Sequence, residues 1–290
     1  GKIKLGMKIS IREGSAAKNF DALIDLIDDY PEMLLFCSDD KHPDNLALSH
    51  INELVCRAVA KGKNVFDVLR AACINPILHY DLPVGQLREG DGADFIVVQD
   101  LEKFEVLSTY IRGEKVAENG KTRIPRVKNE VINHFNTSIK SPTDFQIPAQ
   151  GTQVRVIEAL DGQLITPEVE GEITVKNGLA ESNPDQDILK ITVVNRYQDA
   201  PPALAFIKNF GLKSGAIASS VGHDSHNIIA VGVDDASICR AVNLLIEAKG
   251  GVSAVWEDQE EVLPLPVGGI MSPEDGYEVA AAYTRIDRIA

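Results

Sequence analysis

The sequence predicts a mixed α/β protein with two domains. Strand-like and helix-like segments alternate over the first 80 residues, which is typical of a sheet covered by helices. From residue 151 to the end, short β-type segments recur around one long amphipathic helix, which indicates an α+β domain. The length of 290 residues agrees with about two domains of ordinary size.

The first part of the chain predicts parallel strands joined by helices. A continuous apolar run at 33–37 is expected to be buried on both faces, as in a parallel sheet, and a shorter strand is predicted at 7–11. Helical spacing of apolar residues predicts helices at 19–29, 46–61 and 64–72. The last helix is expected to end before Asn75 and Pro76, because the residue preceding a proline disfavours the α conformation.

Polar residues follow both predicted strands. Glu13 comes after the first strand, and Asp39, Asp40 and His42 come after the second. Residues just beyond the carboxyl ends of parallel strands carry the chemistry in βα folds, so these four are candidate site residues. The alternative for Glu13 is an exposed ion pair with Arg12. For Asp40 the alternative is capping of the next turn, and for His42 a solvent-facing side chain.

The rest of the chain is predicted to be rich in strands. The segment 83–125 contains turn residues and three predicted strands, at 95–98, 106–111 and 115–117. The stretch 126–150 is polar and contains proline, and we interpret it as a connector. Later strands are predicted at 154–159, 172–175, 188–194, 216–220, 227–233 and 252–256. A helix at 235–249 is expected to stop at Gly250.

A polar turn between two of these strands contains two of the six histidines. His223, Asp224, His226 and Asn227 lie within five positions. Imidazole and carboxylate groups so close together can bind a divalent metal or a polar ligand. The alternative is a hydrogen-bonded turn in which Asp and Asn satisfy backbone donors and the histidines face solvent.

Composition excludes several classes of partner. The net charge of −14 disfavours nonspecific binding to nucleic acid or to anionic membranes, because the overall field repels polyanions. The sequence has no run of 18 apolar residues, so no membrane-spanning helix is expected, and its start lacks the apolar core of a signal peptide. The four cysteines are far apart and lie in apolar segments, which favours reduced thiols in a cytoplasmic protein.

Four segments carry a recognisable combination of motifs. They are Met-Lys-Ile-Ser-Ile-Arg-Glu-Gly-Ser at 7–15, Ser-Asp-Asp-Lys-His-Pro at 38–43, Gly-Leu-Lys-Ser-Gly-Ala-Ile-Ala-Ser-Ser-Val-Gly-His-Asp-Ser-His-Asn at 211–227 and Leu-Pro-Leu-Pro-Val-Gly-Gly-Ile-Met-Ser at 263–272. In this order, they resemble the bacterial and archaeal adenine deaminase family. That family belongs to the metal-dependent amidohydrolase superfamily, which the segment at 87–98 also resembles. Asn195-Arg196-Tyr197 departs from the pattern, since a histidine is expected after the arginine.

The resemblance implies a domain arrangement. Residues 1–82 look like the end of a (β/α)8 amidohydrolase barrel, with strands seven and eight and their helices. Residues 83–125 look like part of a small β-sandwich, 126–150 remain a connector, and 151–290 look like the family's carboxyl-terminal α+β domain. The other six barrel strands and most metal ligands are then expected in an amino-terminal part, on the same polypeptide or on a separate one. We expect only the portion from about residue 150 onward to fold independently.

The resemblance also implies an activity, the hydrolysis of adenine to hypoxanthine and ammonia in purine salvage. A divalent metal, manganese or iron, would activate the water. Asp39 is implied as the catalytic residue and a metal ligand, and Glu13, Asp40 and His42 as residues that contact the substrate or the rim. The turn with His223, Asp224, His226 and Asn227 is a possible second site. A homo-oligomer is the default state of this superfamily.

Two alternatives stay open at this point. One is a related amidohydrolase that acts on another cyclic amidine or amide, and the other is a noncatalytic structural domain. Under the leading hypothesis, the chain by itself is expected to lack activity.

Overall fold

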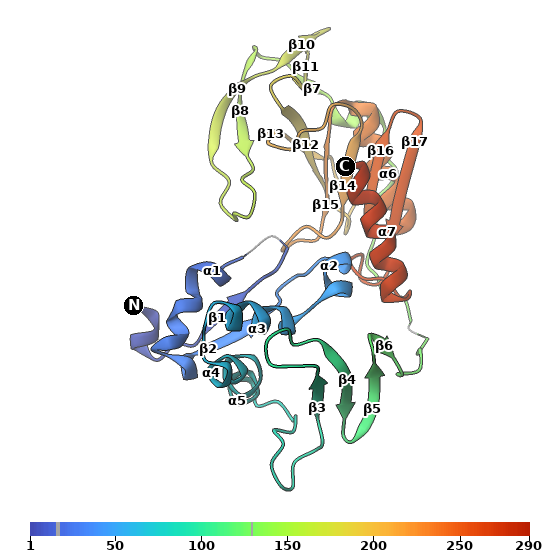
Figure 1. Ribbon diagram of the computed structural model, residues 1–290. Coiled ribbons are helices and arrows are strands. Elements are labelled where there is room, and N and C mark those ends of the chain that lie inside the picture. The colour runs from blue at the N-terminus through green and yellow to red at the C-terminus, as the bar shows by residue number, and fades with distance from the viewer. Residues whose placement is uncertain (16–17, 129) are drawn as a thin grey trace. The chain divides into compact units, whose positions relative to one another are not determined.

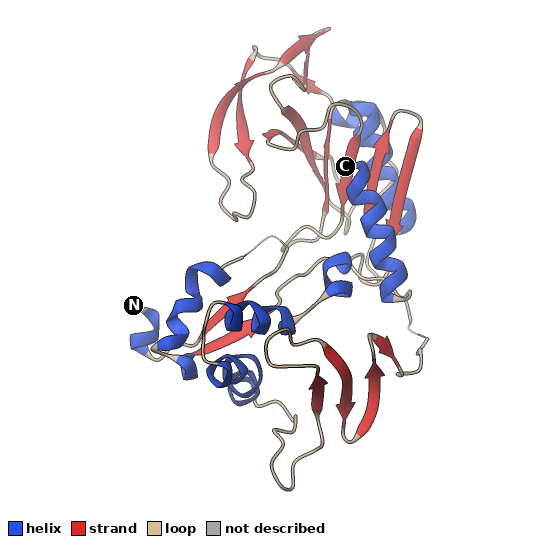
Figure 2. Ribbon diagram, in the orientation of Figure 1, coloured by secondary structure: helices blue, strands red, loops and turns tan. Residues whose placement is uncertain are grey.

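The computed structural model describes residues 1–15, 18–128 and 130–290. The chain divides into two compact units, Gly1–Val127 and Lys128–Ala290. Both units combine helices and strands (Figures 1 and 2), so the predicted mixed α/β class is confirmed. None of the helices in the described residues is long and apolar enough to cross a membrane.

The first unit contains the predicted parallel pair of strands. Strand β1, Ile9–Arg12, pairs with β2, Leu34–Cys37, in a register that sets Arg12 opposite Cys37. The apolar residues of β2 are buried, as the continuous run predicted. The connection consists of α1, Phe20–Leu23, followed by the 3-10 helices Ile24–Asp28 and Pro31–Met33.

The long helix predicted at 46–61 is wrong, because two helices occupy this region. They are α2, Pro43–Leu48, and α3, Ile51–Ala60. Ser49 between them has extended backbone angles, and its hydroxyl donates to Glu53 Oε2 at 2.6 Å. The backbone N–H of His50 donates to Asn52 Oδ1 at 3.0 Å. Side-chain hydrogen bonds of Ser and Asn compete with helical ones and start a new helix here.

The predicted helix end before Asn75 and Pro76 is also wrong. Helix α4, Val65–Leu69, continues through a π-helical turn, Arg70–Ile74, into α5, Asn75–Tyr80. Pro76 lies in the first turn of α5, where the widened π turn tolerates its missing N–H. The buried Asn75 amide donates to the carbonyls of Pro31 and Leu34, both at 2.7 Å, and so fixes this junction beside β2.

A four-stranded antiparallel sheet completes the first unit. Its strands, in spatial order, are β3 (Phe95–Val98), β4 (Val106–Ile111), β5 (Glu114–Glu118) and β6 (Lys121–Thr122). The first two match the predicted bounds, and β5 extends the predicted third strand by one residue at each end.

The second unit is built on an eight-stranded sheet with the order β17-β16-β14-β15-β12-β13-β8-β9. Its strands are β8 (Gln153–Glu158), β9 (Glu168–Glu172), β12 (Ile188–Val194), β13 (Ala203–Lys208), β14 (Ala216–Ser219), β15 (Ile228–Gly232), β16 (Gly251–Trp256) and β17 (Gln259–Pro264). Helix α6, Asp235–Ala248, packs against β14, β15 and β16, while α7, Gly276–Ile289, contacts β16 and β17 (Figure 1).

A small sheet with the order β10-β11-β7 lies in the same unit. Its strands are β7 (Ile147–Pro148), β10 (Thr174–Lys176) and β11 (Leu179–Glu181). The single strand predicted at 172–175 is therefore wrong, since this stretch joins the end of β9 to β10. The sequence interpretation also did not include β11, β13, β17 or α7.

The stretch interpreted as a connector is packed into the second unit. It contains a 3-10 helix, Pro142–Phe145, and strand β7. Phe135 and the fully buried Phe145 belong to the apolar core that α6 shares with β14 and β15. Residues before 150 therefore contribute to the stability of this unit.

Replacing Phe145 tests that contribution. We expect Phe145→Ala to destabilise the second unit by about 3–5 kcal/mol, because it leaves a cavity in a closed core. The measurement is urea unfolding followed by fluorescence of Trp256, the one tryptophan of the chain, which lies in β16. Phe210→Ala is the matched control, since Phe210 is 37% exposed, and it should cost much less. Equal unfolding midpoints for wild type and Phe145→Ala would show that Phe145 does not contribute to the stability of the second unit.

Candidate functional site

The loops after β1 and β2 are tied together by backbone and side-chain hydrogen bonds. Because the two strands are parallel, their carboxyl ends lie at the same edge. The N–H of Ser15 donates to the carbonyl of Asp40 at 3.0 Å, and the N–H of His42 donates to Ser15 Oγ at 2.8 Å. The structure thus brings together the two loops that contain the predicted residues.

Asp39 lies at this edge and is paired with Arg12. Arg12 Nη1 lies 2.8 Å from Asp39 Oδ2, and the Asp39 side chain is about one quarter exposed (26%). Asp39 adopts a φ of 52°, in the left-handed region that Asp tolerates better than most residues. The guanidinium orients one carboxylate oxygen, while Oδ1 makes no hydrogen bond within the described residues. The group is therefore held in place with one oxygen available.

Glu13 has other partners than Arg12. Its Oε2 lies 2.6 Å from Arg57 Nη1, and its Oε1 accepts from the N–H of Phe20 at 3.1 Å. The Arg57 guanidinium in turn stacks over the Phe20 ring, 4.1 Å from its centroid. The suggested pair of Glu13 with Arg12 is not formed, since Arg12 bonds to Asp39 instead. Oε2 of Glu13 thus ties α3 to this loop, and Oε1 ties the start of α1 to it.

Asp40 and His42 are exposed beside Asp39. His42 is the N-cap residue of α2, which makes no side-chain capping hydrogen bond. Their roles toward a substrate stay predictions.

A polar network lies where α2 ends and α3 begins. Glu53 Oε2 accepts from Ser49 Oγ at 2.6 Å and from Lys41 Nζ at 2.9 Å. The Ser49 hydrogen bond, with the Lys41 ammonium, lowers the pKa of Glu53 from its ordinary value of 4.5. Burial, with the charge of Lys41, lowers the pKa of His50. The network anchors the residue that follows Asp40 in the chain.

The polar turn of the second unit joins β14 to β15. The rings of His223 and His226 meet edge to face with centroids 5.2 Å apart. The N–H of His226 donates to the carbonyl of Gly222 at 2.7 Å, and Asn227 Oδ1 accepts from the N–H of Arg196 at 3.3 Å. Asp224 is exposed. Across residues 1–15, 18–128 and 130–290, no group of three or more His, Cys, Asp or Glu side chains could hold a metal.

Sequence reasoning singled out Asn195-Arg196-Tyr197 without giving it a role. The structure places Arg196 two residues beyond the end of β12, in a buried position. Tyr197 Oη donates to the carbonyl of Ser225 at 2.9 Å, so these two residues support the polar turn.

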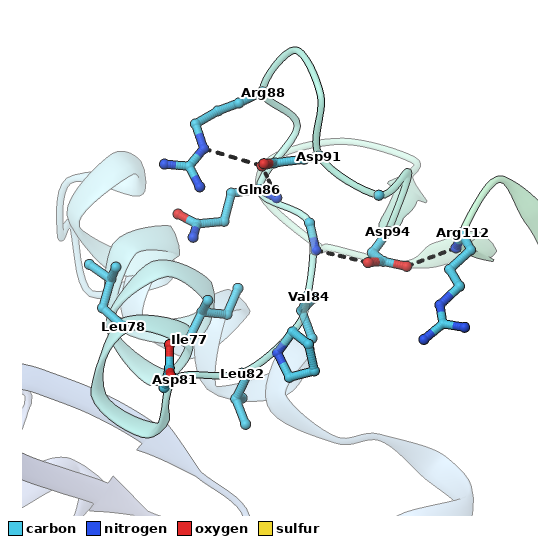
Figure 3. A pocket seen from close by; sticks show the side chains of 13 residues that line it. Ile77, Leu78, Asp81, Leu82, Val84, Gln86, Arg88, Asp91, Asp94 and Arg112 are labelled. Carbon is cyan, nitrogen blue, oxygen red and sulfur yellow. Dashed lines mark hydrogen bonds and ion pairs between the residues drawn. The ribbon is translucent and has the colours of Figure 1, made fainter.

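The first unit also has a pocket of about 460 Å³, shown in Figure 3. It is lined mainly by the loop between α5 and β3, together with Ile77 and Leu78 of α5 and with Arg112 after β4. Asp94 accepts from the N–H groups of Gly85 and Arg112, both at 2.8 Å, and these hydrogen bonds lower the pKa of Asp94. None of the predicted site residues lines this pocket, and its polar groups are used to shape the loop.

Two family models match the chain. Residues 163–290 match the adenine deaminase C-terminal domain, and residues 3–116 match the amidohydrolase family. An adenine deaminase from Salinibacter ruber is 54% identical over 98% of this chain and 52% of its own length. An adenine deaminase from Sulfurovum sp. is 55% identical over 99% of this chain and 52% of its own length. Over nearly its whole length the chain is similar to adenine deaminases.

The chain spans about half the length (52%) of the family members just named. Among solved structures, a β-aspartyl dipeptidase from Fervidobacterium islandicum AW-1 aligns with 42% of this chain and 34% of its own, with 24% identity and a TM-score of 0.36.

Removing the Glu53 carboxylate tests the network beside the candidate site. A lowered pKa in the folded state adds stability above about pH 4.5, which is lost as the pH falls through the lower folded pKa. We therefore expect Glu53→Gln to lower the melting temperature near neutral pH, and the difference from wild type to shrink toward about pH 3. Melting curves recorded between about pH 3 and neutral pH measure this difference in melting temperature. Glu89→Gln, at an exposed loop position, should leave the pH dependence of the melting temperature unchanged. If the melting temperature of Glu53→Gln differs from that of wild type by the same amount at every pH, the Glu53 carboxylate does not stabilise the fold in this way.

Proposed function

We propose that this chain is part of an adenine deaminase, which converts adenine and water to hypoxanthine and ammonia. The observation that carries the proposal is the 54% identity to a protein named adenine deaminase over 98% of this chain. The amidohydrolase match over 3–116 supports a hydrolytic reaction, and it includes all the site residues that were predicted in the first unit.

In this proposal Asp39 transfers the proton. A carboxylate at the carboxyl end of β2 can accept a proton from the attacking water and deliver it to the leaving amine. Arg12 supports this role because it holds Oδ2 and leaves Oδ1 without a hydrogen bond in the described residues.

The family implies a divalent metal, and this chain supplies at most a small part of its site. Carboxylate oxygens are suitable ligands for such ions, so Asp39 Oδ1 fits as one ligand. The described residues do not add the histidines or carboxylates that would complete a set. A metal of this kind lowers the pKa of water. Manganese or iron is proposed from the family alone, and the remaining ligands are expected outside this chain.

The finer architecture is part of the same proposal. Strands β1 and β2 would be strands seven and eight of a (β/α)8 barrel, and β3–β6 would belong to the small sandwich. The two-stranded parallel sheet supports this, because such a pair exposes edges that a closed barrel would cover. A second barrel part, in cis or in trans, a homo-oligomer and a cytoplasmic location complete the proposal, with His223, Asp224, His226 and Asn227 as a possible second site.

Asp39→Asn tests the catalytic assignment in an enzyme extended to the length of its curated relatives. We expect kcat/KM for adenine to fall by about 10²–10⁴, because amide nitrogen and oxygen cannot shuttle the proton. Hypoxanthine and ammonia are measured with added manganese. Asp29→Asn, the same change at an exposed position of the same unit, should retain activity. Full activity in Asp39→Asn would remove Asp39 from the mechanism, and no adenine turnover by the unaltered enzyme would refute the proposed function.

The 290-residue chain by itself is expected to be inactive. Its described residues bring no metal-binding group together, so ammonia release from adenine should stay at background. Equilibrium dialysis followed by elemental analysis should likewise find no stoichiometric manganese. Robust turnover by the chain by itself would contradict both expectations.

A further inference from the structure

Arg196 places a positive charge inside the second unit. The residue is only 5% exposed. Its guanidinium carbon lies 4.7 Å from the ring centroid of Tyr197 and 5.8 Å from that of Phe135. Gly269 closes the site on another side, and a Cβ at this glycine would collide with Arg196 Nη1. Close packing thus fixes the guanidinium within the fold.

The hydrogen bonds of Arg196 leave its charge uncompensated. Nη2 donates to Tyr197 Oη at 3.0 Å, Nη1 makes a long contact of 3.5 Å with Asn133 Oδ1, and Nε is buried without any partner. Both partners are neutral. In the described part of the chain, no carboxylate forms an ion pair with Arg196.

The other buried cations of this unit show the contrast. Lys190 is 1% exposed and lies 2.5 Å from Asp235, while Lys140 is 9% exposed and lies 2.5 Å from Asp199. A buried charge normally needs such a partner, because removal from water costs several kcal/mol (of order 20 in the ideal limit). Arg196 differs from both lysines in lacking one, which indicates that its counter-charge is supplied by a ligand.

A second cation lies close to the same groups. Lys249 Nζ is 5.8 Å from the Phe135 centroid, and the carbonyl of Lys249 accepts from Asn133 Nδ2 at 2.6 Å. Lys249 is exposed and also has no ion pair with a described carboxylate. The nearby polar turn adds His226 Nδ1, which is buried without a partner. Positive charge and unused hydrogen-bonding groups therefore gather here in a chain of net charge −14.

We propose that Arg196, Tyr197 and Lys249 form a binding site for a small oxyanion, a carboxylate or a phosphate. The planar guanidinium offers donors in the geometry that both groups accept, and Tyr197, which is 43% exposed, gives the site an edge in contact with solvent. The site lies in the second unit and does not depend on adenine turnover, so it holds or fails separately from the proposed activity.

The test is anion binding by the 290-residue chain at constant ionic strength. Phosphate and acetate are titrated separately by calorimetry, with chloride as the balancing ion. We expect saturable binding of one or both at about millimolar dissociation constant, as suits a site with two cations and one hydroxyl. Acetate binding alone would assign a carboxylate ligand, and phosphate binding alone a phosphate ligand. Absence of saturable binding of both would overturn the proposal.

Two variants and a control assign the binding to these residues. Lys249→Asn removes the charge at a position with φ of 60°, a conformation that asparagine adopts readily, and should weaken binding roughly fivefold. Lys176→Asn removes an equal charge from an exposed site in the same unit and should have no effect. Arg196→Met should abolish binding, and if it does not fold, Lys249→Asn decides. Equal weakening by Lys176→Asn and Lys249→Asn would show diffuse attraction only and refute the site.

Discussion

The parallel pairing of β1 with β2 is the constraint on which the candidate catalytic edge depends. Antiparallel pairing would send the two following loops to opposite edges, whereas the observed register brings both to one edge. Hydrogen bonds between Ser15, Asp40 and His42 then join the loops. The ion pair of Arg12 with Asp39 links the same two segments through their side chains. Backbone pairing sets the position, and these polar contacts set the orientation of the carboxylate.

Strands with a strong local signal were predicted well from the sequence. Phe95–Val98, Val106–Ile111 and Ile188–Val194 have the predicted bounds, because apolar and β-branched residues lie between clear turn signals. The helices of the first unit were less predictable. Ser49, with extended backbone angles and a hydroxyl bonded to Glu53, separates two helices where one was predicted, and a π turn carries another helix past Pro76. In the first case the local conformation of one residue interrupts the predicted helix, and in the second the helix continues in spite of the proline.

The sequence could predict which loops contain the candidate site residues, but not which side chains form hydrogen bonds and ion pairs with them. Its position after a strand indicated Asp39 as a candidate, and the amidohydrolase match includes this part of the chain, while the role of Asp39 stays a prediction. The sequence could not show that Glu13 bonds to Arg57, 44 positions away, because only the packing of α3 brings them together. Arg196 was missed as a candidate for a related reason. Its importance lies in a partner that is absent, and an absent ion pair leaves no pattern in a sequence.

The close approach of Gly269 to Arg196 has an evolutionary consequence. Gly269 has a φ of 75° and no room for a side chain while the guanidinium occupies its place. A shorter residue at 196 would release the steric part of this restriction and leave only the conformational part. We therefore expect substitutions at these two positions, 73 residues apart in the chain, to be coupled, with a side chain at 269 costing less stability after residue 196 has become shorter.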